Sequence, residues 1–64
     1  MNWDQVKGNW SVLKGKAKTQ WAELTDDDLL AVEGEKDKLV GKIQERYGVT
    51  KEEAERQVEE HDWS

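Results

Sequence analysis

The chain repeats one pattern of residues, and this repeat limits what it can fold into. The pattern is a glycine, a leucine, a glycine, a lysine and an aromatic residue, and its second copy lies 26 residues after the first. The first copy is Gly8, Leu13, Gly15, Lys16 and Trp21, and the second is Gly34, Leu39, Gly41, Lys42 and Tyr47. Because an internal repeat sets the number of building units, the sequence predicts an all-α fold of four helices in two helical hairpins.

The length and the lack of cysteine bound the size of the fold. The chain has 64 residues, so we expect residues 1–64 to form a single domain. A domain of this size buries only roughly 60% of the surface that its unfolded chain exposes. No cysteine is present, which excludes disulfides, thiolate metal sites and thiol chemistry. The four tryptophans are expected to compensate, since each buries on the order of 150–250 Å².

The charge is unevenly distributed. The net charge of −5 argues against nucleic acid as a partner. Residues 1–24 carry four lysines and two acids, a net of +2, whereas residues 25–64 carry six bases and thirteen acids, a net of −7. The N-terminus lacks the apolar run of a signal peptide, and no segment approaches the ~20 apolar residues of a membrane span. We therefore expect a soluble cytoplasmic protein, monomeric, with an unidentified protein as its possible partner.

Residues 3–24 are predicted to form one amphipathic helix. Its apolar residues recur in steps of three or four: Trp3, Val6, Trp10, Leu13, Ala17, Trp21 and Leu24. The opposite face is made mostly of small residues: Gly8, Ser11, Val12, Gly15, Thr19 and Ala22. This face is either a solvent-facing surface or a groove for the close approach of another backbone. Because alanine pays about 1–2 kcal/mol to become left-handed, we expect the helix to pass Ala22 and turn at Glu23 or Leu24.

Two threonines mark the starts of the second and fourth predicted helices. Thr25 and Thr50 have the position of N-cap residues, and each is followed three residues later by an acid, Asp28 or Glu53. This arrangement is typical of a capping box, in which the acid bonds back to the backbone of the cap. We expect the cleaner box at Thr50, because the side chain of aspartate is shorter than that of glutamate.

Glycines and apolar residues set the remaining elements. The second helix is expected to end at Gly34, the third to span residues 35–47, and Gly48 to be a left-handed cap. Trp63 falls off the apolar stripe of the fourth helix, so we expect it to pack on the core beyond the helix end. The apolar face of the second helix is predicted to be Leu29, Leu30 and Val32. The most buried residues are predicted to be Trp10, Leu13, Trp21, Leu39, Ile43 and Tyr47.

Few residues are candidates for catalysis or metal binding, and each has a structural explanation. His61 is the single histidine and is expected in the last turn of a helix, where a partly positive ring suits the helix dipole. The run Asp26–Asp28 lacks the alternating ligands and the glycine of a calcium loop, so acids at a helix start explain it better than a magnesium or calcium site. No glycine-rich loop precedes a Lys-Ser or Lys-Thr pair, which excludes a P-loop. We predict no enzyme, and no catalytic, cofactor-binding or metal-binding residues.

The first predicted helix permits a second functional interpretation. It combines aromatic residues with a basic flank, which is typical of a helix that lies in a membrane interface. The residues concerned are Trp3, Trp10, Trp21, Lys7, Lys14 and Lys18. We favour the alternative that the stripe is half of the core, because the other helices would otherwise have nothing to bury against. Nucleic-acid binding through the same residues is disfavoured, since the acidic remainder repels a phosphate backbone.

Several of these segments together carry a resemblance to a known family. They are Gly8–Trp10, Lys14–Lys18, Trp21, Leu24–Asp28, Glu33–Gly34 and Leu39–Gly48. With these motifs the chain resembles, over residues 1 to about 60, the CsbD-like family of small bacterial stress-response proteins. The resemblance implies expression under general stress, two roughly orthogonal helical hairpins, and no catalytic residues to carry over. At position 22 this chain has alanine where enterobacterial members are expected to have glycine. The difference concerns the conformation of the first turn between helices and not the resemblance to the family.

The expected function follows from the residues and the resemblance together. We expect a non-enzymatic general stress-response protein that acts as a soluble interaction or protective module. The alternative is a peripheral membrane-surface binder that uses the amphipathic helix of residues 3–24.

Overall fold

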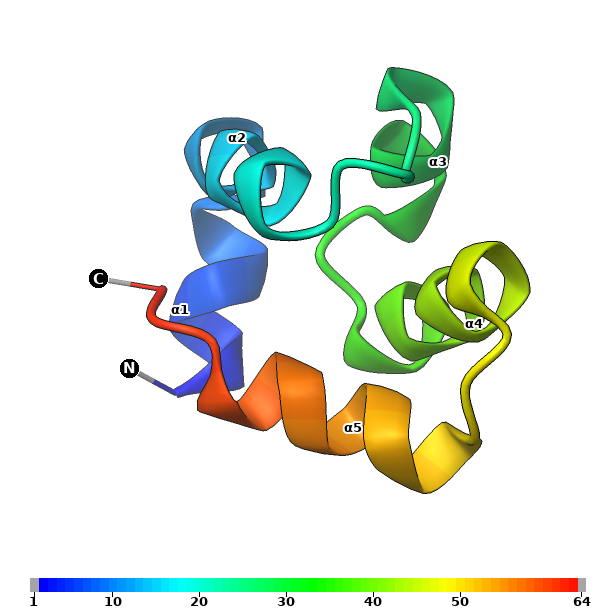
Figure 1. Cartoon of the computed structure of the whole chain (residues 1–64). Helices are drawn as coiled ribbons and strands as arrows, with labels where there is room; N and C mark the ends of the chain where they lie inside the picture. The colour runs from blue at the N-terminus through cyan, green and yellow to red at the C-terminus, as the bar shows by residue number, and fades with distance from the viewer. Residues whose placement is uncertain (1, 64) are drawn as a thin grey trace.

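The structure, a computed structural model, describes residues 2–63. Over this range the chain is all-helical, with five helices and no strand (Figure 1). The helices are α1 (Trp3–Gly8), α2 (Trp10–Gln20), α3 (Asp26–Val32), α4 (Lys36–Tyr47) and α5 (Lys51–Glu60). The prediction of an all-α fold is confirmed. The predicted number of four helices is wrong, because the first predicted helix is divided in two.

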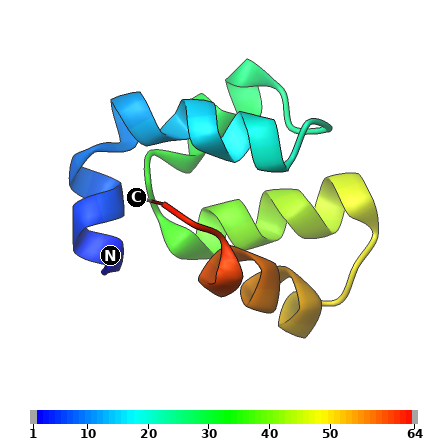
Figure 2. The same ribbon diagram turned by 60° about the vertical axis from the view of Figure 1, so that its left-hand side comes forward.

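The division falls at Asn9, between α1 and α2. The side-chain Nδ2 and the backbone N of Asn9 both donate to the carbonyl oxygen of Gln5, each at 3.0 Å. Asparagine competes for backbone hydrogen bonds in this way, and the preceding Gly8 is also a weak helix former. The carbonyl of Asn9 accepts from the N of Leu13 at 2.9 Å, so α2 begins at once, in a new direction (Figure 2). Apolar spacing cannot reveal this bend, because steps of three or four continue across it.

The end of α2 also differs from the prediction. The helix ends at Gln20 instead of reaching Glu23 or Leu24. Trp21 is its C-cap, with φ −120° and ψ 76°, and the N of Trp21 donates to the carbonyl of Ala17 at 2.8 Å. The N of Leu24 then donates to the carbonyl of Trp21 at 3.0 Å, which closes the turn toward α3. The helix therefore stops at the residue whose large ring enters the core.

Left-handed residues lie at the ends of α3 and α4, and the predicted left-handed cap at Gly48 is confirmed with φ 66°. Within residues 2–63, Glu33 is the single non-glycine residue with positive φ, at 53°, so Ala22 takes no left-handed strain. Gly34 follows with φ 78° and ends this element, as predicted. A Cβ atom at Gly34 would lie 2.8 Å from the Cα of Lys7. Glycine at this position therefore lets the backbone of α1 approach the end of α3.

Both predicted N-caps form, but the complete capping box is the one at Thr25. Its Oγ1 accepts from the N of Asp28 at 3.0 Å, and the Asp28 carboxylate accepts from the N of Thr25 at 3.1 Å. The Oγ1 of Thr50 accepts from the N of Glu53 at 3.1 Å, but the Glu53 carboxylate pairs with Arg56 on the next turn. The expectation of a cleaner box at Thr50 is therefore wrong, because an arginine on the same helix competes for the acid.

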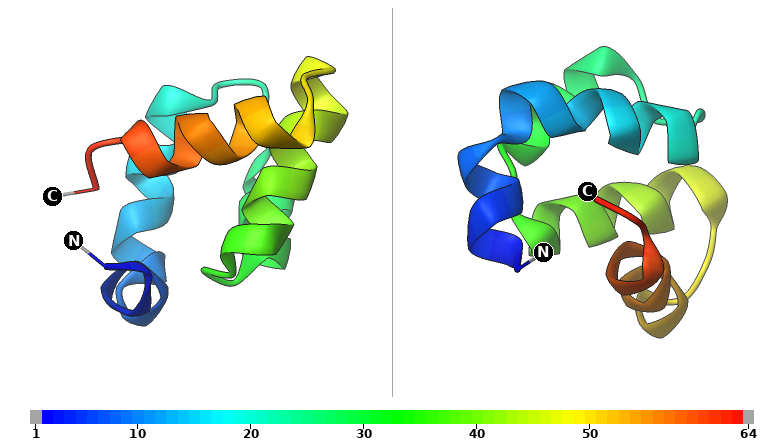
Figure 3. Two further views of the ribbon diagram at one scale, coloured as in Figure 1. Left: turned by 90° about the horizontal axis from the view of Figure 1, so that it is seen from below. Right: turned by 90° about the vertical axis from the view of Figure 1, so that its left-hand side faces the viewer.

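α4 lies between two other helices and packs against both α3 and α5. In Figure 2, α2 and α4 run in the same general direction, and α5 is seen nearly end-on, so α5 crosses them. Figure 3 shows the same crossing from two further sides and places both chain ends beside α1. The description as two separate hairpins fits only in part, because α4 packs on α3 as well as on its own partner α5.

The core contains most of the residues predicted for it. Those that are buried as predicted are Trp10, Leu13, Trp21, Leu39 and Ile43. The prediction for Tyr47 is wrong, since it is 40% exposed and its hydroxyl accepts from the N of Glu23 at 3.1 Å, over the α2–α3 connection. The prediction for Leu30 as part of an apolar face is also wrong. Leu30 is 57% exposed, whereas Leu29 and Val32 are buried, because the short α3 turns only these two toward the core.

Trp63 packs on the core beyond the end of α5, as predicted. Its Nε1 donates to the carbonyl of Val58 at 3.2 Å. Its ring centroid lies 5.6 Å from that of Trp3, and 6.1 Å from those of Trp10 and Trp21. This aromatic cluster joins the C-terminal segment to α1 and α2.

Replacing Trp10 by alanine should lower the free energy of unfolding by roughly 3–5 kcal/mol. The ring is buried, and its Nε1 donates to the carbonyl of Leu29 at 2.8 Å, so the change removes both volume and a buried hydrogen bond. The loss is comparable to the whole stability of so small a domain. Urea unfolding followed by circular dichroism measures it, with Trp10→Phe as a control that keeps most of the volume. An unchanged midpoint for Trp10→Ala would show that α2 does not pack through this ring.

Replacing each of three glycines by alanine should change the free energy of unfolding, with a loss at two positions and a gain at the third. Gly48→Ala should destabilise by about 1–2 kcal/mol, because Gly48 is left-handed with φ 66°. Gly34→Ala should cost more, because the added methyl group also meets the backbone of Lys7. Gly41→Ala should stabilise by up to about 0.8–1 kcal/mol, since Gly41 lies exposed inside α4 with no atom within 4 Å of a new Cβ. Thermal melting tests the order, and a loss at Gly41 larger than at Gly48 would contradict it.

Candidate functional site

His61 serves the aromatic cluster and not the helix dipole. It follows the last residue of α5 with an extended backbone, and its ring centroid lies 5.1 Å from that of Trp21 and 4.5 Å from that of Trp63. Burial lowers the pKa of His61, and the opposing effect of Asp62 does not cancel it. The expectation of a partly positive ring at this position is therefore wrong, because desolvation favours the neutral form.

The aspartates Asp26–Asp28 are divided among three different environments. Asp28 is buried, at 5% exposure, and accepts from the Nε of Arg46 at 2.9 Å and from its Nη2 at 3.2 Å. The Nζ of Lys42 lies 3.5 Å from the same carboxylate. The Arg46 guanidinium, helped by the Thr25 amide, holds the pKa of Asp28 well below its usual range. Asp28 thus joins the start of α3 to α4.

The other two acids of the run do not assemble into a metal site. Asp26 lies 3.6 Å from the Nζ of Lys18, and Asp27 is exposed. Within residues 2–63, no group of three or more histidine, cysteine or acidic side chains is arranged to hold a metal ion. The run therefore supplies a helix start, a salt bridge to α2 and a salt bridge to α4.

Acid should weaken the fold partly through Asp28. Because its pKa is lowered in the folded state, the carboxylate adds stability that is fully present above its unfolded pKa of about 3.9. This contribution is lost as the pH falls below that value, when the unfolded state binds the proton first. Asp28→Asn should therefore be less stable than the wild type at neutral pH, with a difference that narrows below about pH 4.

Urea unfolding between neutral and acidic pH measures this difference. Asp27→Asn is the matched control, since Asp27 is exposed in the same helical turn. A difference between Asp28→Asn and the wild type that stays constant with pH would contradict the assigned role of the ion pair.

The tryptophan stripe of the predicted first helix points into the molecule. Trp10 and Trp21 are buried, and Trp3 is partly buried against the core. Of the flanking lysines, Lys7 lies 3.9 Å from Glu35 and Lys18 forms the salt bridge to α3 described above. The residues that would insert into a membrane are thus already occupied by core packing.

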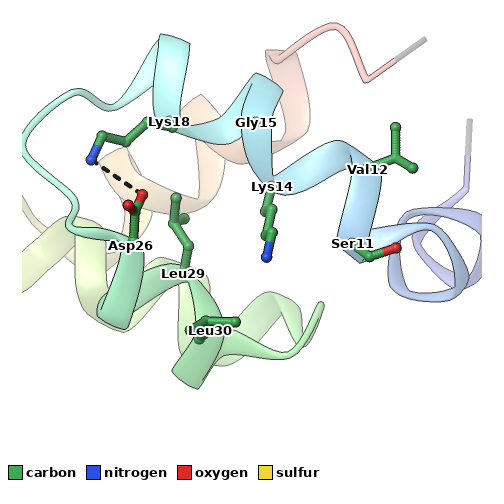
Figure 4. A pocket seen from close by; sticks show the side chains of 8 residues that line it. All are labelled: Ser11, Val12, Lys14, Gly15, Lys18, Asp26, Leu29 and Leu30. Carbon is green, nitrogen blue, oxygen red and sulfur yellow. Dashed lines mark ion pairs between the residues drawn. The ribbon is translucent and has the colours of Figure 1, made fainter.

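A groove between α2 and α3 is the strongest candidate for a binding site (Figure 4). Its volume is about 420 Å³, within the usual size range of ligand pockets. The residues that line it are Ser11, Val12, Lys14, Gly15, Lys18, Asp26, Leu29 and Leu30. Leu30 is 57% exposed and Val12, on the rim, is 72% exposed, so the groove presents large apolar side chains to solvent.

Of the two lysines that line the groove, Lys18 forms a salt bridge and Lys14 forms none with the described part of the chain. Figure 4 shows Lys14 extending from α2 toward α3, with the Lys18–Asp26 salt bridge at one end of the groove. Lys14 is half-buried and makes no ion pair or hydrogen bond through its side chain within residues 2–63. Gly15 is exposed, and a Cβ atom there would have no neighbour within 4 Å. The side of the groove formed by α2 therefore lacks a side chain at Gly15 and carries the ammonium group of Lys14, which is unpaired among the described residues.

One wall of this groove has a signal in the sequence. The small face that holds Ser11, Val12 and Gly15 is predicted either to face solvent or to form a groove for another backbone; in the structure these residues are exposed and line an open groove, and a contact with another backbone stays a prediction. The opposite wall is not predicted, because the sequence pattern assigns Leu30 to an apolar face. Neighbouring residues on a helix point about 100° apart, so Leu29 and Leu30 cannot both face the core squarely on a short helix. Because Val32 lies three residues after Leu29, these two share the core face, and Leu30 is the leucine left exposed.

None of the five described helices has the length and apolar character that crossing a bilayer requires.

Comparison with known proteins places the chain among small bacterial proteins. It is 64% identical to a UPF0337 protein of Pectobacterium atrosepticum over 58 residues, which cover 91% of this chain and 84% of that protein. It is 59% identical to the UPF0337 protein YjbJ of Escherichia coli K12, with the same coverage. It is 58% identical to a UPF0337 protein of Bordetella pertussis over 60 residues, 94% of this chain and 91% of that protein. Residues 4–56 match the CsbD-like family, and the chain belongs to this family.

Proposed function

We propose that this protein is a non-enzymatic bacterial stress-response protein that acts as a soluble interaction module, with the α2–α3 groove as its contact surface. The observation that carries the proposal is the exposure of Leu30 beside an open groove in a chain whose other large apolar residues are mostly buried. Exposed apolar surface next to polar residues is typical of protein-interaction sites. The stress response is what the resemblance to CsbD-like proteins implies.

The perturbed ionisable groups support a binding role over a catalytic one. The negative charge of Asp28 is paired with Arg46 and Lys42, and the ring of His61 contacts the indole rings of Trp21 and Trp63. Both groups are thus occupied in holding helices together, and neither lines the α2–α3 groove. The groups that do line the groove are suited to contact a partner by packing and by charge.

We place the protein in the cytoplasm as a monomer. A net charge of −5 makes two copies repel each other, and it repels nucleic acid as well. The alternative of a membrane-surface binder would require Trp10 and Trp21 to leave the core, which the packing of the aromatic cluster opposes. We therefore prefer a protein partner.

Rescue of a stress phenotype tests the proposal. A strain that lacks its own CsbD-like gene should regain survival under general stress when it expresses the wild-type chain, and should fail to regain it with Leu30→Glu. Ala31→Glu is the matched control, because Ala31 is the next residue on α3, is exposed and does not line the groove. Both variants should unfold within a few tenths of a kcal/mol of the wild type, as surface substitutions do. Equal rescue by the two variants would contradict a role for the groove.

A further inference from the structure

We propose that the α2–α3 groove binds an acidic amphipathic helix of a partner protein. The inference rests on the proposed function and adds the chemistry of the partner. It is carried by the shape of the groove, by its exposed leucine and by the available charge of Lys14.

The shape of the groove suits a helix. Ser11 and Gly15 lie one turn apart on α2, and their small side chains leave that wall open to the backbone of another helix. On the other wall Leu30 is exposed, while Leu29, which also lines the groove, is buried. A partner helix with apolar residues at steps of three and four can cover Leu30 and leave its polar face in solvent.

The charge of the groove selects an acidic partner. Of the three lysines of α2, Lys14 and Lys18 line the groove, and the acid that lines it is Asp26 on α3. Lys18 is already paired with Asp26, whereas the ammonium of Lys14 has no anionic partner within residues 2–63. A carboxylate on the partner helix can supply this missing anion in a half-buried position, where charge pairs are screened less than on an open surface.

Other occupants fit less well. Asp26 lines the groove and repels a continuous array of phosphates, whether from a nucleic acid or a membrane surface, whereas a helix can place single carboxylates beside Lys14 and away from Asp26. A second copy docked symmetrically through the same surface would bring two Lys14 side chains close together, since such an interface uses the same patch twice. A helix that carries both carboxylates and apolar side chains matches each feature of the groove.

A library of random peptides tests the proposal while the natural partner is unidentified. Phage-displayed peptides of about 16 residues, long enough for roughly four helical turns, are selected on the immobilised full chain. The selected peptides should be net negative, with apolar residues at steps of three and four. In amide NMR spectra of the chain, a selected peptide should shift the signals of Lys14, Gly15 and Leu30.

Two substitutions and a matched control sharpen the result. Lys14→Glu should weaken binding of the selected peptide at least ~10-fold, which corresponds to about 1.4 kcal/mol. Gly15→Leu should weaken it as much by filling the groove. Lys51→Glu makes the same charge change at an exposed site on α5 and should leave the affinity within about twofold. Amide spectra of each variant alone verify that the fold is kept.

Several outcomes would overturn the proposal. They are the recovery of no peptide or only of basic ones, NMR shifts outside the groove, and equal effects of Lys14→Glu and Lys51→Glu. Salt-sensitive binding of anionic phosphatidylglycerol vesicles, or self-association through the groove, would replace the partner helix by a membrane or a second copy. The rescue assay separates this failure from that of the proposed function. If the wild-type chain fails to restore stress survival, the proposed function fails even where acidic peptides bind as expected.

Discussion

The fold depends on the ring of Trp63, which contacts rings from three separate parts of the chain. Trp3 belongs to α1, Trp10 begins α2 and Trp21 is the C-cap of α2, and all three ring centroids lie within 6.1 Å of that of Trp63. Since a chain of this length buries little surface and has no disulfide, such a cluster supplies much of the apolar area that holds the helices together. Together with the close approach of Lys7 to Gly34, it holds α1 in place beyond the break at Asn9.

A second interaction, the ion pairs of the buried Asp28, joins α3 to α4. The carboxylate of Asp28 accepts from Arg46 and lies near Lys42, so the first turn of α3 is joined to the second half of α4. The same carboxylate closes the capping box with Thr25. One buried acid therefore ends the α2–α3 connection, starts α3 and sets its position against α4. This explains why a short helix of seven residues keeps a defined place in the fold.

Elements with local signals are predictable from the sequence, and features that depend on packing are not. The caps at Thr25 and Thr50 are predictable because capping depends on residues three positions apart, and the packing of Trp63 because it falls off a helical stripe. The bend at Asn9 is hidden, since apolar periodicity continues through it. Tyr47 lies on the predicted apolar face of α4 but leaves the core to bond the backbone of Glu23, a contact 24 residues away. For the candidate site, the small face of α2 is predictable, whereas its pairing with α3 is a tertiary contact without a local signal.

The two faces of α2 separate the stability of the protein from its proposed contact with a partner. Trp10 and Leu13 face the core, and Lys14 and Gly15 face the groove. A glycine inside a helix costs about 0.8–1 kcal/mol relative to alanine, and at Gly15 no neighbouring atom of residues 2–63 would clash with the methyl group of an alanine. A marginally stable domain gains nothing from such a residue through its own packing. In the proposed complex, the open wall at Gly15 is where the backbone of the partner helix comes close to α2.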